Sequence, residues 1–177
     1  TNPEEIVYKH FLDSLMPLKY EEFPEGSSLI DVGTGAGFPG LALLIARPDL
    51  KVTLLDSTQK KLTAVADIAE NLGLAPNFVH ARAEEAGKDP AFREQFDFAT
   101  ARAVSNLREL SESCLPFVKK GGIFLAMKGP DIKQELKDAR RAIGILGGEP
   151  EKMVAYGIDD KGERHLLFIR KTGNTPD

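Results

Sequence analysis

The stretch that decides the fold is the glycine-rich turn Asp31-Val32-Gly33-Thr34-Gly35-Ala36-Gly37-Phe38-Pro39-Gly40. The short apolar run before it, residues 28–32, predicts a strand that ends in the glycines. Glycine permits a positive φ and a close approach of backbone to ligand, so the chain can turn sharply here. Pro39 suits the first turn of a helix, which we expect to run to about Ala46. The free N–H groups at the start of that helix favour an anionic group of a bound ligand.

Segments typical of strands and helices alternate along the rest of the chain. Strands are predicted at residues 52–56, 77–80, 96–101 and 122–127. Helices are predicted at residues 3–18, from a cap at Ser57 or Thr58 to about residue 72, at residues 106–115 and at residues 131–145. Strands at residues 153–158 and 165–170, joined by a turn at residues 159–162, predict a closing hairpin. This alternation implies an α/β fold with a mostly parallel, doubly wound sheet.

Composition excludes several classes of protein. The 177 residues are 42% hydrophobic and 28% charged, which is ordinary for one globular domain. The longest apolar run, residues 41–46, is too short to span a bilayer, and no signal segment opens the chain, so we expect a cytoplasmic protein. Cys114 is the single cysteine, which excludes an internal disulfide and a cysteine zinc cluster. No metal site is predicted, and Cys114 is best assigned to the core.

The charge distribution leaves two interpretations open. The net charge of −4 argues against a protein that holds nucleic acid by bulk charge alone. Basic residues nevertheless gather in two groups: Lys119, Lys120, Lys128, Lys133, Lys137, Arg140 and Arg141, and then Lys161, Arg164, Arg170 and Lys171. They indicate either solvated helix and strand faces or a basic rim beside a site that receives a polyanion.

The glycine turn alone indicates a nucleoside-type cofactor of two possible classes. Gly35-x-Gly37-x-x-Gly40 matches the dinucleotide fingerprint, whereas Asp31-x-Gly33-x-Gly35-x-Gly37 matches the pattern of S-adenosylmethionine enzymes. Asp56 ends the second predicted strand and could hydrogen-bond ribose hydroxyls in either class.

Three features favour S-adenosylmethionine over NAD. A carboxylate at Asp31 suits the cationic methionine end of S-adenosylmethionine and is awkward beside a diphosphate. Residues 115–122, Leu-Pro-Phe-Val-Lys-Lys-Gly-Gly, are similar to the segment that leads into the fifth strand of many methyltransferases. The closing hairpin resembles the antiparallel last strand of the class I methyltransferase fold. An NAD-dependent oxidoreductase remains the alternative.

Several ordered segments resemble one family. They are KHFLDSL (9–15), DVGTGAGFPG (31–40), LLDS (54–57), ARAEE (81–85), ARAV (101–104), MKG (127–129) and ERH (163–165). In this order they resemble the bacterial glucose-inhibited division protein B family, the guanine-N7 methyltransferases of small-subunit (16S) ribosomal RNA. The resemblance runs from about residue 9 to residue 171.

This resemblance implies a class I, Rossmann-like methyltransferase with a seven-stranded, mostly parallel sheet, an antiparallel last strand and helices on both faces. We expect a single domain with an N-terminal helical segment (1–26), a cofactor-binding core (27–148) and a closing hairpin (149–171). The chain opens at Thr1, and we expect both termini to be trimmed. We further expect a monomer without membrane contact, whose partner is the small-subunit RNA or the assembling subunit.

The resemblance also assigns cofactor contacts to Gly33, Phe38, Ala83, Glu84 and Arg102. The residue patterns add further candidates on the turn and after the second strand, namely Asp31, Gly35, Gly37 and Asp56. Arg102 ends the fourth strand, where it could pair with the cofactor carboxylate or with an RNA phosphate.

Candidates for RNA or guanine contact are Lys128, at the end of the fifth strand, and Arg164 and His165, at the start of the last. His10 and Ser14 lie four apart on one helix face and could cap the pocket, although a structural histidine is an equal alternative.

The implied reaction is methyl transfer to guanine N7, an in-line displacement at the cofactor sulfonium. N7 carries an in-plane lone pair and needs no deprotonation, so catalysis would rest on alignment and desolvation without an acid or base residue. Two alternatives stay open: a methyltransferase acting on a small molecule or protein, and a non-catalytic RNA-binding protein that senses the cofactor.

Overall fold

The computed structural model describes residues 2–102, 105–157 and 162–176. Within these residues, seven strands form one sheet in the order β3-β2-β1-β4-β5-β7-β6. The strands are β1 (Ser28–Val32), β2 (Lys51–Asp56), β3 (Asn77–His80), β4 (Phe96–Ala101), β5 (Val118–Lys128), β6 (Gly148–Tyr156) and β7 (Arg164–Lys171).

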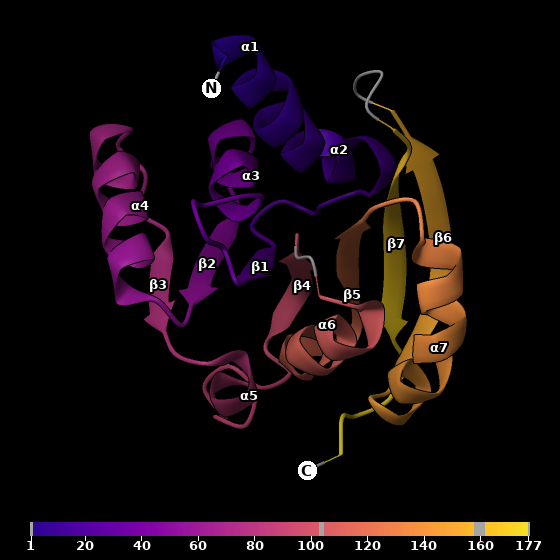
Figure 1. Ribbon diagram of the computed structural model, residues 1–177. Coiled ribbons are helices and arrows are strands. Elements are labelled where there is room, and N and C mark those ends of the chain that lie inside the picture. The colour runs from indigo at the N-terminus through magenta and orange to yellow at the C-terminus, as the bar shows by residue number, and fades with distance from the viewer. Residues whose placement is uncertain (1, 103–104, 158–161, 177) are drawn as a thin grey trace.

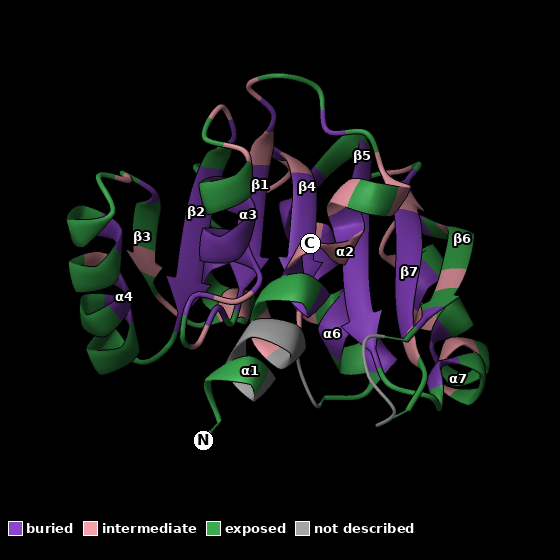
Figure 2. Ribbon diagram, turned by 90° about the horizontal axis from the view of Figure 1, so that it is seen from above, coloured by how far each residue is buried: buried purple, intermediate pink, exposed green. Residues whose placement is uncertain are grey.

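Strand β1 pairs in parallel with β2 on one side and with β4 on the other, so the chain order reverses at this point of the sheet. Strands β3 and β5 extend the parallel sheet outward, and β7 runs antiparallel to both β5 and β6. Figure 2 shows the arrowheads of β2, β4 and β5 pointing to the edge where the N-terminal helix α1 lies. In sheets of this kind, ligands bind beyond the carboxyl ends of the strands where the order reverses.

Helices cover both faces of the sheet (Figure 1). They are α1 (Pro3–Ile6), a π-helical segment (Val7–Leu12), α2 (Asp13–Tyr20), α3 (Gly40–Ala46), α4 (Gln59–Asn71), α5 (Ala83–Ala86), α6 (Leu107–Cys114), a 3₁₀ turn (Leu115–Phe117) and α7 (Ile132–Ile145). One apolar cluster joins α3 and α4 to the sheet through Leu43, Val65 and Leu54, and residues of α2 pack against it. The other joins α6 and α7 through Leu110 and Ile143. The sheet is therefore buried between two helical layers, as predicted.

Cys114 lies in the second of these clusters, with no exposed surface, which confirms its assignment to the core. Burial raises the pKa of its thiol. No helix among the described residues is both long and apolar enough to cross a membrane.

The structure differs from the sequence-based prediction in several elements. The first helical region extends to Tyr20 and contains the π-helical segment. Strand β5 is longer at both ends than predicted. Strand β6 begins at Gly148 rather than at residue 153, because an edge strand tolerates Pro150 and the local register shift between Pro150 and Lys152.

Two further predictions concern helix α4 and the closing hairpin. Thr58 is the residue before helix α4, but its side chain makes no capping hydrogen bond. The pairing of β6 with β7 confirms the hairpin; of its predicted turn, residues 159–162, residues 159–161 lie outside the described residues.

Candidate functional site

The glycine turn leaves β1 at the carboxyl edge of the sheet, as predicted. Gly33 and Gly37 have φ values of +71° and +92°, in the left-handed region that disfavours residues with a Cβ. A Cβ added at Gly33 would meet no atom within 4 Å, whereas at Gly37 it would come within 3.1 Å of Leu41 and 3.2 Å of Val65. Gly33 therefore leaves room for a ligand, and Gly37 lets helix α3 pack closely on its neighbours.

The Asp31 side chain stabilises this turn through hydrogen bonds. Its carboxylate oxygen Oδ2 accepts hydrogen bonds from the Thr34 hydroxyl at 2.6 Å and from the Gly40 backbone N–H at 2.8 Å. The other oxygen, Oδ1, is buried and has no hydrogen-bond partner among the described residues. Burial raises the pKa of the Asp31 carboxyl to about 6, against hydrogen bonds from Thr34 and Gly40 that lower it. The unused oxygen could accept from a cationic ligand group such as the ammonium of S-adenosylmethionine, but the side chain has no exposed surface, so this contact stays a prediction.

Asp56 joins the end of β2 to the same turn. Its Oδ2 accepts a hydrogen bond from the Gly35 N–H at 2.9 Å, and its Oδ1 accepts one from the Thr58 N–H at 2.9 Å. The side chain thus shapes both the glycine turn and the entry into α4. A carboxylate has about four acceptor positions, so these two bonds leave Asp56 able to accept from ribose hydroxyls as well.

A cavity of about 340 Å³ lies beyond the ends of β1, β2 and β3. Four predicted cofactor residues line it, namely Gly33, Asp56, Ala83 and Glu84. Its volume suits a nucleoside, and its walls combine apolar side chains, such as Leu110, with polar and charged ones, such as Asp56 and Lys61. The short helix α5, which sequence reasoning missed, places Ala83 half-buried at the wall and leaves Glu84 exposed beside Arg82.

Arg102 follows β4 and contacts the N-terminal helical region. Its guanidinium lies over the Phe38 ring, 5.3 Å from the centroid, and its Nη2 is 3.1 Å from His10 Nδ1. His10 stacks on Phe38 with ring centroids 5.5 Å apart. Arg102 Nη1 also reaches the Ser14 hydroxyl at 3.3 Å. The structure therefore brings His10, Ser14, Phe38 and Arg102 together at the edge of the glycine turn.

A second cavity, of about 330 Å³, lies on the β5 side of Arg102. Its described lining residues are Asp13, Arg102, Met127, Lys128, Gly129, Tyr156 and Arg164. Three residues that the sequence predicts as ligand or RNA contacts therefore line the same cavity, namely Arg102, Lys128 and Arg164. They come from the carboxyl ends of β4 and β5 and from the start of β7, which runs the other way.

Lys128 is almost fully buried, with 5% of its side chain exposed. Its Nζ donates to the Ser105 carbonyl at 2.6 Å and lies 2.9 Å from Glu135 Oε2. Glu135 in turn accepts from the Leu107 N–H at 2.7 Å. Lys128 thus fastens the segment after β4 to helix α7, and its direct contact with RNA stays a prediction.

His165 is also buried, at 2% exposure. Its Nδ1 is 3.1 Å from the Gly129 carbonyl and its Nε2 is 3.1 Å from Glu163 Oε1. Contact with a guanine would require one of these partners to be exchanged, so its substrate role likewise stays a prediction.

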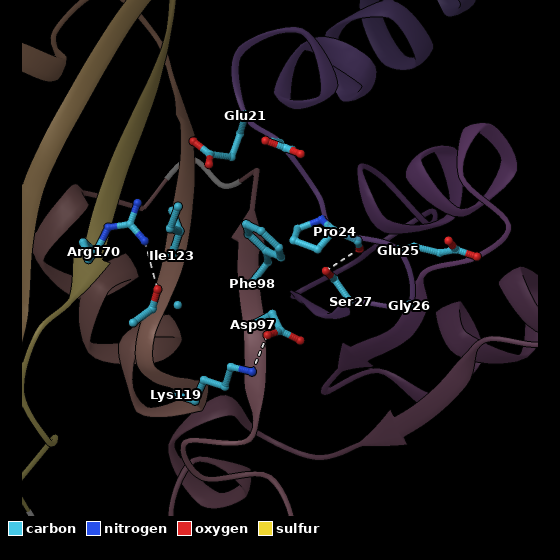
Figure 3. A pocket seen from close by; sticks show the side chains of 13 residues that line it. Glu21, Pro24, Glu25, Gly26, Ser27, Asp97, Phe98, Lys119, Ile123 and Arg170 are labelled. Carbon is cyan, nitrogen blue, oxygen red and sulfur yellow. Dashed lines mark hydrogen bonds and ion pairs between the residues drawn. The ribbon is translucent and has the colours of Figure 1, made fainter.

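The two basic groups of the sequence do not form one rim. Lys171 is buried, and its Nζ donates to the Leu115 carbonyl at 2.8 Å and the Thr175 hydroxyl at 2.6 Å. Lys119 and Arg170 line a third cavity of about 460 Å³ at the opposite, amino-terminal edge of the sheet (Figure 3). There Lys119 pairs with Asp97, and Arg170 pairs with Glu151 at 2.7 Å.

Sequence reasoning missed Asp13 and Tyr156. The Asp13 carboxylate contacts Arg102, Arg164 and Tyr156, although these residues are far apart in the chain. The available signal was the position of Asp13 inside KHFLDSL, between His10 and Ser14. Tyr156 ends β6 and carried no local signal. Among the described residues, no group of three or more His, Cys, Asp or Glu side chains is placed to hold a metal ion.

The fold is shared with solved methyltransferases. The ribosomal protein L11 methylase of Lactobacillus delbrueckii superposes with a TM-score of 0.70 and 15% identity, covering 93% of this chain and 80% of that one. TrmN of Thermus thermophilus superposes with a TM-score of 0.70 and 20% identity, covering 89% of this chain and 48% of that one. The class I methyltransferase fold predicted from the sequence is thereby confirmed.

Comparison with known sequences identifies the family, whereas the solved structures identify only the fold. Residues 1–167 match the family GidB, described as rRNA small subunit methyltransferase G. The ribosomal RNA small subunit methyltransferase G of Lactobacillus delbrueckii is 52% identical over 180 residues, which cover 99% of this chain and 75% of that protein. Its counterpart in Clostridium novyi is 46% identical over 178 residues, with 99% and 73% covered. The chain therefore belongs to the GidB family of rRNA small subunit methyltransferases.

Proposed function

We propose that this protein transfers a methyl group from S-adenosylmethionine to N7 of a guanosine in 16S ribosomal RNA. The observation that carries the proposal is the juxtaposition of two cavities at the carboxyl edge of the sheet, in a chain that belongs to this family. One cavity suits a nucleoside cofactor, and the other is lined by three cationic side chains.

S-adenosylmethionine is the cofactor of this family and fold, and it supplies an electrophilic methyl group when bound. We assign its methionine end to the glycine turn, with Asp31 Oδ1 facing the ammonium and Gly33, Gly35 and Gly37 allowing the close approach. Asp56 is assigned to the ribose, and Ala83 and Glu84 to the adenine. Phe38 and Arg102 close the turn on the substrate side.

The chain's own contribution is binding and alignment. Bound S-adenosylmethionine would supply the methyl group to the N7 lone pair, with the S–C bonding pair left on sulfur, so no residue of the chain would have to remove a proton. Lys128, Arg164, His165 and His10 are assigned to the substrate side, either by touching RNA or by holding the segments that do. Alignment and exclusion of water supply the rate.

We further propose the form of the RNA substrate, the oligomeric state of the enzyme and its compartment. The substrate is small-subunit RNA, naked or partly assembled with protein, and the enzyme acts as a single-domain monomer in the cytoplasm.

Two measurements test these assignments. Calorimetry with S-adenosylhomocysteine and NAD(H) side by side should show binding of the first alone; the reverse result would restore the oxidoreductase alternative. Radiolabel from S-adenosyl[methyl-³H]methionine should enter the RNA of small subunits. Label in ribosomal protein or in a small molecule instead would favour the other substrate classes, and cofactor binding without any turnover would favour a sensor.

A further inference from the structure

Asp13 is the point where four elements meet beside the second cavity. It begins α2, and its side chain is 3% exposed. Its Oδ2 lies 2.7 Å from Arg164 Nη1 and 3.4 Å from Arg102 Nη1. Its Oδ1 accepts a hydrogen bond from the Tyr156 hydroxyl at 2.7 Å. Burial and the bond to Asp13 raise the pKa of that hydroxyl, so Tyr156 stays a donor at neutral pH.

The charges around Asp13 do not balance. One carboxylate lies between two guanidinium groups, and the remaining cation of this cavity, Lys128, is already paired with Glu135. The charged side chains that line this cavity, counted together with Glu135, therefore carry an excess of one positive charge. Arg102 and Arg164 keep 22% and 26% of their side chains exposed, whereas Asp13 is covered. A ligand that enters the cavity thus meets the guanidinium groups rather than the carboxylate.

Two guanidinium groups held side by side form a fork of N–H donors that suits a tetrahedral oxyanion. Arginine side chains lose much conformational freedom on binding, so a group that fixes them beforehand improves affinity. Asp13 can fix both at once because it is itself immobilised by Tyr156 and by helix α2.

On these grounds, and resting on the proposed function above, we propose that Asp13 is a positioning residue for the RNA substrate. Its carboxylate holds Arg102 and Arg164 in place as a subsite for a phosphate of the RNA backbone. Asp13 itself touches neither the RNA nor the cofactor.

A positioning role for Asp13 predicts the opposite change in RNA affinity from the one that net charge alone predicts. Asp13→Asn removes a negative charge, as does Asp67→Asn on the exposed face of α4, far from the cavity. Bulk electrostatics predicts that both variants bind RNA equally well or slightly more tightly than wild type. Positioning predicts that Asp13→Asn alone binds more weakly, by about tenfold, with a slope of log Kd against log salt reduced by about one to two.

The experiment measures the Kd of each variant for small-subunit ribosomal RNA across a salt series, with S-adenosylhomocysteine present. Calorimetry gives the affinity for S-adenosylhomocysteine, which should stay within about threefold of wild type. Tyr156→Phe removes the hydroxyl that holds Asp13 without changing charge, and it should weaken RNA binding in the same direction. Because this variant keeps both ion pairs, it tests the idea even if Asp13→Asn fails to fold.

Equal RNA affinity in Asp13→Asn and Asp67→Asn, or in Tyr156→Phe and wild type, overturns the proposal. So does a loss of S-adenosylhomocysteine binding as large as the loss of RNA binding, since the oxyanion held would then be the cofactor carboxylate. If wild type itself fails to methylate small-subunit RNA, the proposed function fails instead, and the two failures are distinct.

Discussion

The Asp31 carboxylate accepts a hydrogen bond from the Gly40 backbone N–H at 2.8 Å through Oδ2, while its other oxygen is buried without a partner among the described residues. The last residue but one of β1 is thereby tied to the first residue of α3 across the whole glycine turn. Because the carboxylate is enclosed, its charge is costly unless a cationic ligand is bound.

This cost predicts a pH dependence of stability. The pKa of Asp31 is raised from 3.8 to about 6, so the folded protein binds a proton more tightly than the unfolded chain. The contribution of this group to the free energy of unfolding therefore falls as pH rises from about 4 to 6, by ~3 kcal/mol in all. Denaturant unfolding of wild type and Asp31→Asn across this range should show wild type losing stability relative to the variant, which has no titrating group here, as pH rises. A difference that is constant with pH would contradict the assignment.

Gly33 offers a test of the cofactor cavity. In Gly33→Ala, the Cβ meets no protein atom but projects at a positive φ beside the cavity. Gly73→Ala is the matched control, since it has a φ of +67° and equally open space at the end of α4. Both variants should lose about 1–2 kcal/mol of stability from backbone strain. Only Gly33→Ala should weaken S-adenosylhomocysteine binding in calorimetry, by about tenfold or more; equal affinities in the two variants would remove Gly33 from the site.

Substitution of Lys128 should distinguish a role in RNA methylation from a role in cofactor binding. Lys128→Ala should abolish RNA methylation while affinity for S-adenosylhomocysteine is kept, because Lys128 lines the second cavity and reaches the first only through the Ser105 carbonyl. Breaking its buried pair with Glu135 should also lower the free energy of unfolding by about 3 kcal/mol. The assay is methyl transfer at a temperature where the variant is fully folded, and full activity there would exclude Lys128 from the site.

Substitution of Lys171 should lower the stability of the protein without changing its activity. Its side chain is fully buried and joins the Leu115 carbonyl, the Thr175 hydroxyl and Glu94 below the sheet. Lys171→Met should cost about 3 kcal/mol of stability, since Glu94 loses its buried partner. The exposed residue Lys137 on α7 supplies the control, Lys137→Met, which should cost almost nothing. Methylation per folded molecule should be unchanged in both; a specific loss in Lys171→Met would mean that this anchor reaches the site.

Local patterns were sufficient for the fold. The bounds of β1, β3 and β4 follow from short apolar runs, and the glycine turn follows from its own residues. Strand β6 was placed too late because Gly148 and Pro150 weaken a strand pattern that pairing with β7 restores. The π-helical segment Val7–Leu12 has no sequence signal comparable to a glycine turn.

The site could be predicted only where its residues follow strands or belong to the turn. Lys128 and Arg164 were found as strand-end residues, but the partners that bury or hold them, Glu135 and Asp13, come from helices distant in sequence. Ion pairs of this kind depend on how elements pack, which no local pattern records. For the same reason, the separation of the basic residues between the two edges of the sheet was not predictable.

The most direct test of the central claim is to map the methylated base. Small subunits from a strain lacking this protein would be incubated with the purified protein and S-adenosylmethionine, and their RNA would be analysed by reduction and aniline cleavage, which detects N7-methylguanosine, and by mass spectrometry of the nucleosides. We predict one new N7-methylguanosine in the 16S RNA, absent when the protein is omitted. Methylation at another atom or base, or no methylation of this RNA, would contradict the account.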